Sequence, residues 1–144
     1  MVTAQQAFFN LPVHDLHRSQ EFFAAIGFAF YPQYTSELAA CLIIRENTFV
    51  MLVTEDFFKS GLPGKQIVDS AENVESIVAL SLDSRAEVDR RTDLAVAAGA
   101  SAVSEPNDSG FIYSRNFQDL DGHVWVFNFL DFDHAADDMD QEGE

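Results

Sequence analysis

The sequence predicts an α+β protein made of two βαβββ modules in one chain. The main observation is an internal repeat, because a strand-like segment, a helix-like segment and three strand-like segments follow one another twice, over roughly 50 residues each. The second observation is that both helix-like segments carry start and stop signals. The third is a hydrophobic content of 47%, which is typical of a globular protein. A chain of 144 residues fits one domain made of two fused halves.

The first module is expected at about residues 5–54. Its first strand runs from residue 5 to 13, where apolar side chains alternate with others. Asp15 is the expected N-cap of a helix that ends at Gly27. Three strand-like runs follow, at residues 28–34, 38–45 and 48–54.

Residues 55–73 are interpreted as a linker, because their glycines and prolines interrupt any long element. A short helix near Phe57 and Phe58 is expected within it. The second module is expected at about residues 74–130, and its first strand at residues 74–83.

The second module repeats the order of the first. Ser84 and Glu87 have the spacing of a capping box, and the helix that they begin is expected to end at Gly99. Three strands follow, at about residues 102–105, 111–117 and 123–129. The Asp121–Gly122 pair favours a tight turn with positive φ between the last two strands.

The acidic C-terminal segment, residues 131–144, has no apolar pattern and is expected to be a disordered tail. The folded domain is therefore expected to span residues 1–130. The tail holds seven of the 24 Asp and Glu residues and no Lys or Arg. The rest of the chain keeps 17 acids against 8 bases, so it is acidic too. A field of this sign repels phosphate, which argues against nucleic-acid and membrane-surface partners.

The compartment is expected to be the cytoplasm. Cys41 is the only cysteine, so an internal disulfide is excluded. The N-terminal residues do not have the pattern of a signal peptide. No apolar run approaches the roughly 20 residues that a membrane-spanning helix requires.

Each module is expected to pack one sheet face beneath its helix and to leave the other face open. On the strand at residues 74–83, Val78 and Leu80 form the bulky face. Asn10, Ser81 and Asn128 fall on the opposite faces of their strands. A packed core does not readily accept such groups, since an unpaired buried polar group costs about 1–3 kcal/mol. The set favours a groove between the modules that binds a small molecule, although each side chain alone is better explained by pairing with a neighbouring strand or water.

Two segments resemble known proteins. The run from Asn10 to Ser19 (NLPVHDLHRS), followed by Phe22-Phe23 and Gly27-Phe28, resembles the opening of glyoxalase-like proteins. The run from Phe117 to Val126 (FQDLDGHVWV) resembles the final hairpin of the same superfamily. This is the vicinal oxygen chelate (VOC) superfamily, the glyoxalase/bleomycin resistance protein/dioxygenase group, and the nearest likeness is to predicted lactoylglutathione lyase-like proteins. The resemblance covers about residues 5–130, and it implies the glyoxalase/bleomycin resistance fold and a homodimer.

The resemblance also locates four metal-ligand positions, which metal-dependent members of the superfamily fill with His, Gln or Glu. Aligning the motifs places Phe8, Met51, Ile77 and Val126 there. None of them is a first-choice ligand for nickel, zinc, iron or manganese. A shift of one residue brings in no ligand either, since the adjacent residues are Ala7, Phe9, Val50, Leu52, Ser76, Val78, Trp125 and Phe127. We therefore expect no metal and no cofactor.

Ten residues are the candidates for ligand binding: Phe8, Asn10, Arg45, Met51, Ile77, Ser81, Tyr113, Arg115, Val126 and Asn128. Arg45, Tyr113 and Arg115 are included because they could reach an anionic group. The more common fate of such residues is a salt bridge at the rim of a site. Glu75 lies two residues before Ile77 and is a weak candidate for a general base, against the alternative of an exposed glutamate at a strand end.

Three functions remain open at this point. The best supported is a metal-free protein that binds a small apolar or amphipathic molecule in the groove. The alternative is a glyoxalase-type lyase, isomerase or dioxygenase, lactoylglutathione lyase-like, with a metal site that the sequence does not reveal. The third is a metal-independent enzyme that uses Glu75 or another acid. Whether the protein is an enzyme is not decided by the sequence.

Overall fold

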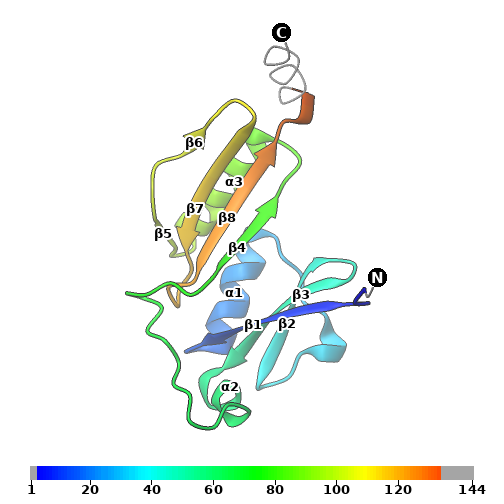
Figure 1. Cartoon of the computed structure of the whole chain (residues 1–144), viewed down its shortest axis with the longest axis vertical. Helices are drawn as coiled ribbons and strands as arrows, with labels where there is room; N and C mark the ends of the chain where they lie inside the picture. Colours follow the sequence, from blue (N-terminus) through cyan, green and yellow to red (C-terminus); the bar gives the residue numbers. More distant parts are fainter. Residues whose placement is uncertain (1–2, 134–144) are drawn as a thin grey trace. The chain divides into compact units, whose positions relative to one another are not determined.

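The computed structural model describes residues 3–133, and the expected disordered tail lies mostly outside them, at residues 134–144. The α+β class is confirmed, because helices pack on two separate β-sheets. The chain divides into two compact units, Met1–Asn73 and Val74–Glu144, and each is described by itself (Figure 1). In the described part of the chain, no helix has both the length and the hydropathy that crossing a membrane requires.

The first unit contains a three-stranded sheet with the order β1-β3-β2. Its strands are β1 (Ala7–Val13), β2 (Ala39–Arg45) and β3 (Thr48–Thr54). β1 runs parallel to β3, whereas β2 and β3 form an antiparallel hairpin. The helix α1 (Leu16–Ile26) contacts β2 and β3, and the short helix α2 (Glu55–Ser60) follows β3.

The ends of α1 agree with the capping signals in the sequence. The side chain of Asp15 accepts a hydrogen bond from the backbone N–H of Arg18 at 3.1 Å. Gly27 has a φ of 106°, a left-handed conformation that glycine adopts without steric cost, and its N–H bonds back into the last turn. These two contacts satisfy backbone groups that a helix otherwise leaves unpaired.

The strand expected at residues 28–34 is replaced by one isolated bridge and a 3-10 helix. Phe30 pairs with Leu42 of β2, and the N–H of Tyr31 donates to the carbonyl of Cys41 at 2.8 Å. The chain then turns into the 3-10 helix η1 (Pro32–Tyr34). The prediction of a full strand was wrong because Pro32 has no N–H to extend a ladder and fits the first turn of a helix.

The second unit has a sheet with the order β4-β8-β7-β5, and β6 also pairs with β7. Its strands are β4 (Ile77–Ser81), β5 (Ser101–Ala102), β6 (Asn107–Asp108), β7 (Ile112–Gln118) and β8 (Val124–Leu130). β4 runs parallel to β8, and β7 and β8 form an antiparallel hairpin. The helix α3 (Arg85–Ala97) contacts β7 and β8, and it lies behind this sheet in Figure 1.

The first turn of α3 is fixed as the sequence predicts. The hydroxyl of Ser84 accepts a hydrogen bond from the N–H of Glu87 at 3.1 Å. The carboxylate of Glu87 instead binds Arg90, with contacts of 2.7 and 3.0 Å. The single strand expected at residues 102–105 is two short strands, β5 and β6. Pro106 lies between them, and proline cannot donate to a sheet ladder.

The core of each unit lies between its helix and its sheet, on the face that alternation predicts. On the helix side of β1, β3 and β8 the buried side chains are Leu11, Val13, Val50, Leu52, Trp125 and Phe127, and on the other side of β3 Phe49 and Val53 are buried too. Phe22, Phe23 and Ile26 of α1 are buried as well. Complete burial of such a side chain contributes on the order of 1.5–3 kcal/mol. The helix-covered face of each sheet therefore provides much of the stability, and the strand residues that stay exposed on the opposite face remain for function.

Candidate functional site

The open face of the second unit is the surface opposite α3, and side chains from three strands form rows across it. One row joins Ser81 of β4, Asn128 of β8 and Ser114 of β7. The next row joins Ala79, Val126 and Asn116, and the next one Ile77, Val124 and Gln118. In Figure 1 no helix or strand lies between this face and the viewer. Four of the candidates, Ile77, Ser81, Val126 and Asn128, thus share one surface.

A hydrogen bond crosses this surface at its polar row. The hydroxyl of Ser81 donates to the side-chain oxygen of Asn128 at 2.7 Å. The pairing that was the simpler explanation for each of these polar residues therefore exists, from β4 to β8. It occupies only one end of the carboxamide, because an asparagine side chain has an oxygen acceptor and two N–H donors.

The open face of the first unit lies opposite α1, and Asn10 of β1 is the register partner of Met51 of β3 there. Phe8 is on the same face, and its ring stacks on Phe49 with a centroid distance of 5.0 Å. Phe8 is 41% exposed, whereas Phe49 is buried. The candidates Phe8, Asn10 and Met51 therefore form a second group, on the sheet of the first unit.

Two tyrosines extend this group into an aromatic cluster that sequence reasoning missed. The ring of Tyr31 packs edge-on against Phe49 at 6.3 Å, and Tyr34 packs against Phe8 at 6.2 Å. Tyr31 and Tyr34 also contact each other at 5.0 Å. The tyrosines lie in and beside η1, so a full strand at residues 28–34 would have arranged them differently. Their signal in the sequence is the Tyr-Pro-Gln-Tyr run.

Tyr113 and Arg115 lie on the other side of the second sheet, facing α3. Their register partners on β8 are Phe129 and Phe127, which belong to the helix side. The hydroxyl of Tyr113 donates to Asp89 of α3, and Arg115 donates to Asp89 and Asp93 at 3.3 and 2.9 Å. The structure does not bring these two residues together with the other candidates.

The same alternation brings Ser114, Asn116 and Gln118 to the open face, and sequence reasoning missed them. The side-chain oxygen of Asn116 accepts a hydrogen bond from the backbone N–H of Ser104, and its side-chain nitrogen donates to the hydroxyl of Ser104, both at 2.9 Å. The signal was available, since every second residue from Ser114 to Gln118 is uncharged and polar.

The two remaining candidates lie outside the rows. Arg45 is exposed at the end of β2, where a register irregularity pairs it with Thr48. Thr48 has the same parity as Val50, which faces α1, so Arg45 is not aligned with Asn10 and Met51. Glu75 is exposed and precedes the first residue of β4 by two positions.

The donor set of the open faces does not fit a divalent metal. Their strand residues are apolar, hydroxyl or amide side chains apart from the thiol of Cys41, whose burial raises its pKa and favours the neutral form. Within residues 3–133, no group of three His, Cys, Asp or Glu side chains is placed to hold a metal ion. Divalent metals of the kinds that VOC enzymes use are held by imidazole and carboxylate, which these faces lack.

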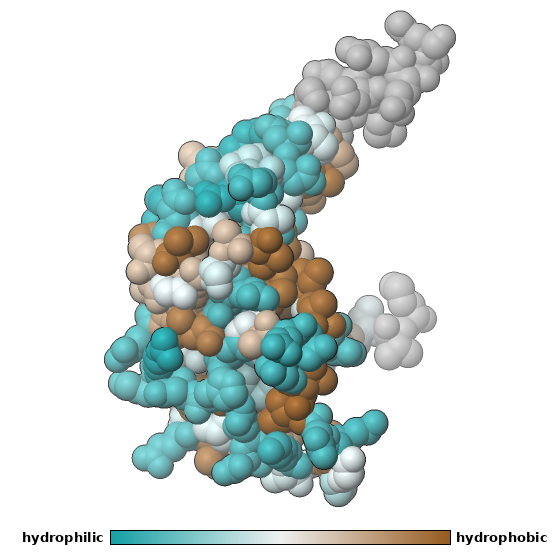
Figure 2. Space-filling model, turned by 90° about the vertical axis from the view of Figure 1, so that its left-hand side faces the viewer, coloured by the Kyte–Doolittle hydropathy of each residue, from teal (hydrophilic) through white to brown (hydrophobic). Residues whose placement is uncertain are grey.

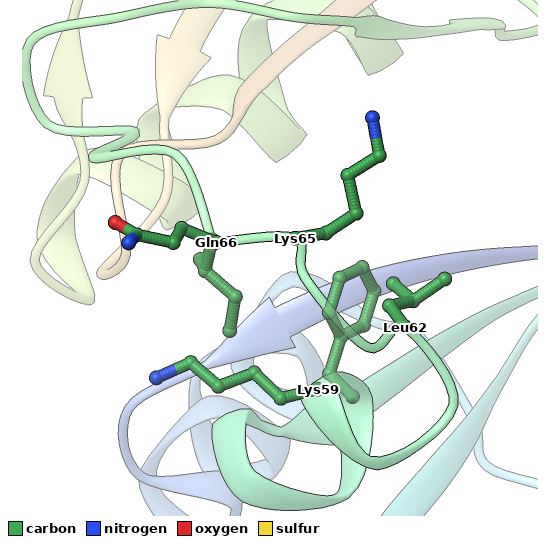
Figure 3. Close-up of a pocket in the computed structure, with 6 residues that line it drawn as sticks. Lys59, Leu62, Lys65 and Gln66 are labelled. Carbon is green, nitrogen blue, oxygen red and sulfur yellow. The ribbon is translucent and has the colours of Figure 1, made fainter.

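A small hollow in the first unit does not compete with the open faces as a ligand site. It has a volume of about 20 Å³ and is lined by Phe58, Lys59, Leu62, Lys65, Gln66 and Ile67 (Figure 3). Lys59 and Lys65 are the only lysines of the chain, and Figure 3 shows them extending away from each other. Ligand pockets usually measure about 300–1,000 Å³, so this hollow has room for little more than a water molecule.

The exposed apolar side chains are interrupted by polar ones. Figure 2 shows brown apolar groups separated by hydrophilic residues on one side of the molecule. Two of the more exposed apolar residues of the strands are Phe9, at 57%, and Ile77, at 58%. Ile77 is at one end of the open face of the second unit, beside Val124.

The comparisons with known proteins agree with this architecture. Residues 5–43 match the family model described as bleomycin resistance protein-like N-terminal. The protein SA1046 of Staphylococcus aureus, described as hypothetical, is 27% identical, with a TM-score of 0.72, and the alignment covers 90% of this chain and 95% of that one. A comparison with curated proteins gives no significant match.

More distant solved structures share the fold. A glyoxalase-related enzyme from Fulvimarina pelagi is 19% identical, with a TM-score of 0.74 and 88% of each chain covered. The fosfomycin resistance protein FosX from Listeria monocytogenes is 19% identical, with a TM-score of 0.64, and the alignment covers 93% of this chain and 98% of that one. The N-terminal family match is confined to residues 5–43, and these solved structures show that the chain has the glyoxalase/bleomycin resistance fold over nearly its whole length.

Proposed function

We propose that the protein binds a small apolar or amphipathic molecule on the open faces of its sheets, without using a metal ion. The observation that carries this proposal is the composition of these faces. They combine apolar side chains with uncharged hydroxyl and amide groups, as ligand sites commonly do.

The aromatic cluster indicates the kind of molecule that the first unit accepts. Phe8 and Tyr34 are 41% and 49% exposed, so both residues have surface that is free to contact another apolar group. Aromatic pairs contribute about 0.5–1.5 kcal/mol beyond the burial of their area. A flat apolar or aromatic ligand would therefore gain more from this surface than a compact polar one.

The superfamily's metal-dependent chemistry is less well supported for this chain. Such an enzyme polarises substrate oxygens on a metal held by protein side chains. Phe8, Met51, Ile77 and Val126 offer three hydrocarbon side chains and one thioether. A soft thioether suits copper(I) rather than nickel, zinc, iron or manganese. We therefore propose that the protein binds its ligand without catalysing a metal-dependent reaction.

The test is a titration with the neutral, apolar dye Nile red, followed by its fluorescence. Wild-type protein is expected to bind the dye saturably. Ala79→Arg places a long charged side chain on the open face of the second unit and is expected to weaken binding by about tenfold or more. Ala25→Arg makes the same change on the exposed surface of α1 and is expected to leave binding unchanged.

Two outcomes contradict the proposal. One is the absence of saturable dye binding by folded wild-type protein. The other is equal binding by Ala79→Arg and Ala25→Arg. We also propose, from the superfamily resemblance, that the protein is a homodimer. Light scattering coupled to gel filtration tests that point, and a monomeric mass would contradict it.

A further inference from the structure

The carboxamide of Asn128 is held in a defined orientation on the open face of the second unit. Ser81 donates to its oxygen at 2.7 Å, and the two residues are register partners on β4 and β8. The structure shows no partner for the amide nitrogen within the described residues. If the amide were rotated by half a turn, Ser81 would accept from the nitrogen and the oxygen would be left instead. In both cases one end of the carboxamide is unpaired.

The surroundings of Asn128 are apolar along β8 and polar across the sheet. Val126 and Leu130 precede and follow it on the same face, and all three are partly buried. Ser114 of β7 lies beside Asn128 as its register partner. A ligand lying along β8 would thus place its apolar body on valine and leucine and one polar atom at the carboxamide.

No charged side chain belongs to this face among the described strands. The nearest cation on β7, Arg115, points to the opposite side and is bound to Asp89 and Asp93. An anionic ligand would meet no compensating charge here, and a chain with a formal net charge of −16 repels it. A cationic ligand would find no carboxylate on these strands and would lose part of its hydration shell.

These three observations lead to one assignment, which rests on the proposed function. We propose that the ligand is electrically neutral and that one of its oxygen atoms accepts a hydrogen bond from the amide nitrogen of Asn128. Ser81 is the positioning residue that fixes the carboxamide. Substrates whose recognition depends on a carboxylate, phosphate or phosphonate group are disfavoured by this face.

Three probes of nearly the same shape test the assignment. Acetophenone has a carbonyl oxygen, isopropylbenzene has a methyl group in its place, and benzoate has a negative charge. Affinities are measured from amide chemical-shift changes in nuclear magnetic resonance titrations. Wild-type protein is expected to bind acetophenone about three- to tenfold more tightly than isopropylbenzene, since one hydrogen bond contributes on the order of 1 kcal/mol. Benzoate is expected to show no saturable binding.

Two variants separate hydrogen bonding from packing. Asn128→Leu is expected to lower the affinity for acetophenone to that for isopropylbenzene, and to leave the affinity for isopropylbenzene the same or higher. Ser81→Ala, at an exposed site where folding is not at risk, is expected to weaken acetophenone binding alone. Gln6→Leu removes an exposed carboxamide outside the strands and serves as the control.

The outcomes distinguish this inference from the proposed function. If wild-type protein binds Nile red but does not prefer acetophenone, the inference is wrong and the proposed function stands. The inference also fails if Asn128→Leu weakens both neutral probes equally, or if Ser81→Ala changes nothing. If neither Nile red nor any of the three probes binds, the proposed function fails with it.

Discussion

Asp119 accepts a hydrogen bond from the indole nitrogen of Trp125 at 2.9 Å, and this bond ties the turn between β7 and β8 to the core of the second unit. The other oxygen of the carboxylate accepts from the N–H groups of Asp121 and His123, at 2.9 and 3.0 Å. Both Asp119 and Trp125 are buried. One carboxylate therefore fixes the whole Asp-Gly turn that the sequence predicts.

Replacing the indole tests this contact. Trp125→Phe leaves the carboxylate of Asp119 without one donor and also creates a cavity beneath Phe117, whose ring stacks on Trp125 at 6.5 Å. The free energy of unfolding is expected to fall by about 3 kcal/mol or more, from the lost bond and the lost packing together. Urea denaturation followed by circular dichroism measures it. Tyr34→Phe, which removes an exposed hydroxyl, is expected to change it by less than about 0.5 kcal/mol.

Asp119 also predicts a pH dependence. Burial raises the pKa of its carboxyl group, and the nearby His123 and the hydrogen bond from Trp125 oppose this rise without cancelling it. The folded protein therefore holds the proton more tightly than the unfolded chain does. The resulting stability is present below the unfolded pKa of Asp119 and is lost as the pH rises through the raised folded pKa. Asp119→Asn should accordingly flatten the decline in unfolding free energy between acid and neutral pH.

The matched control is Glu105→Gln, at an exposed glutamate. It removes the same formal charge, so it accounts for the relief of general repulsion in an acidic chain. An equal change of slope in both variants would show that Asp119 has no special role in the pH profile.

Arg115 is predicted to act on stability and not on ligand affinity. Its guanidinium binds Asp89 and Asp93 of α3, and its side chain is 20% exposed. Arg115→Met is expected to lower the free energy of unfolding by roughly 1 kcal/mol, because solvent screens part of these ion pairs. The affinity for Nile red should stay the same. Arg18→Met, at an exposed residue of α1, is the control and should change neither quantity. A loss of dye affinity in Arg115→Met alone would mean that Arg115 takes part in ligand binding.

Much of the fold could be predicted because local signals and tertiary structure agree. The caps at Asp15, Gly27 and Ser84 determine the ends of two helices, and alternation on β1 and β8 assigns their buried faces. The apolar character of residues 28–34 indicates a strand, so it could not predict the 3-10 helix that forms at Pro32–Tyr34. There the missing N–H of Pro32 outweighs strand propensity.

The candidate site was predictable in part, and Arg115 shows where the reasoning fails. Arg115 lies two residues before Phe117, which is fully buried beneath α3. Because side chains alternate along a strand, the sequence could have predicted that Arg115 points towards the helix. A charged side chain on a core face is costly unless it is paired. The partners Asp89 and Asp93 lie on a helix about 25 residues earlier, and only the tertiary structure reveals that they meet Arg115.

Gly99 is predicted to tolerate no side chain. It has a φ of 116°, and a Cβ atom there would lie 3.0 Å from the Cδ2 atom of Leu120. Gly99→Ala is expected to lower the free energy of unfolding by more than about 1 kcal/mol, from backbone strain and this close contact. Gly61→Ala is the control, since it has a negative φ and nothing within 4 Å of the added atom. It should be neutral or stabilising, by up to about 1 kcal/mol, in the same thermal denaturation experiment.

Divalent metals are predicted not to stabilise the protein. A ligand that binds only the folded state stabilises it by RT ln(1 + [L]/Kd) and so raises the melting temperature. The open faces offer no carboxylate or imidazole to nickel, zinc or manganese. Protein stripped with a chelator and dialysed should therefore melt at the same temperature with and without each ion. A weak response to zinc is expected at the surface pair His14 and Glu55, whose side chains meet at 2.6 Å, and this response should fall in His14→Gln. A strong response that survives in His14→Gln, with a stoichiometric ion retained after dialysis, would mean that the protein uses a metal after all and would favour lyase or dioxygenase chemistry over binding alone.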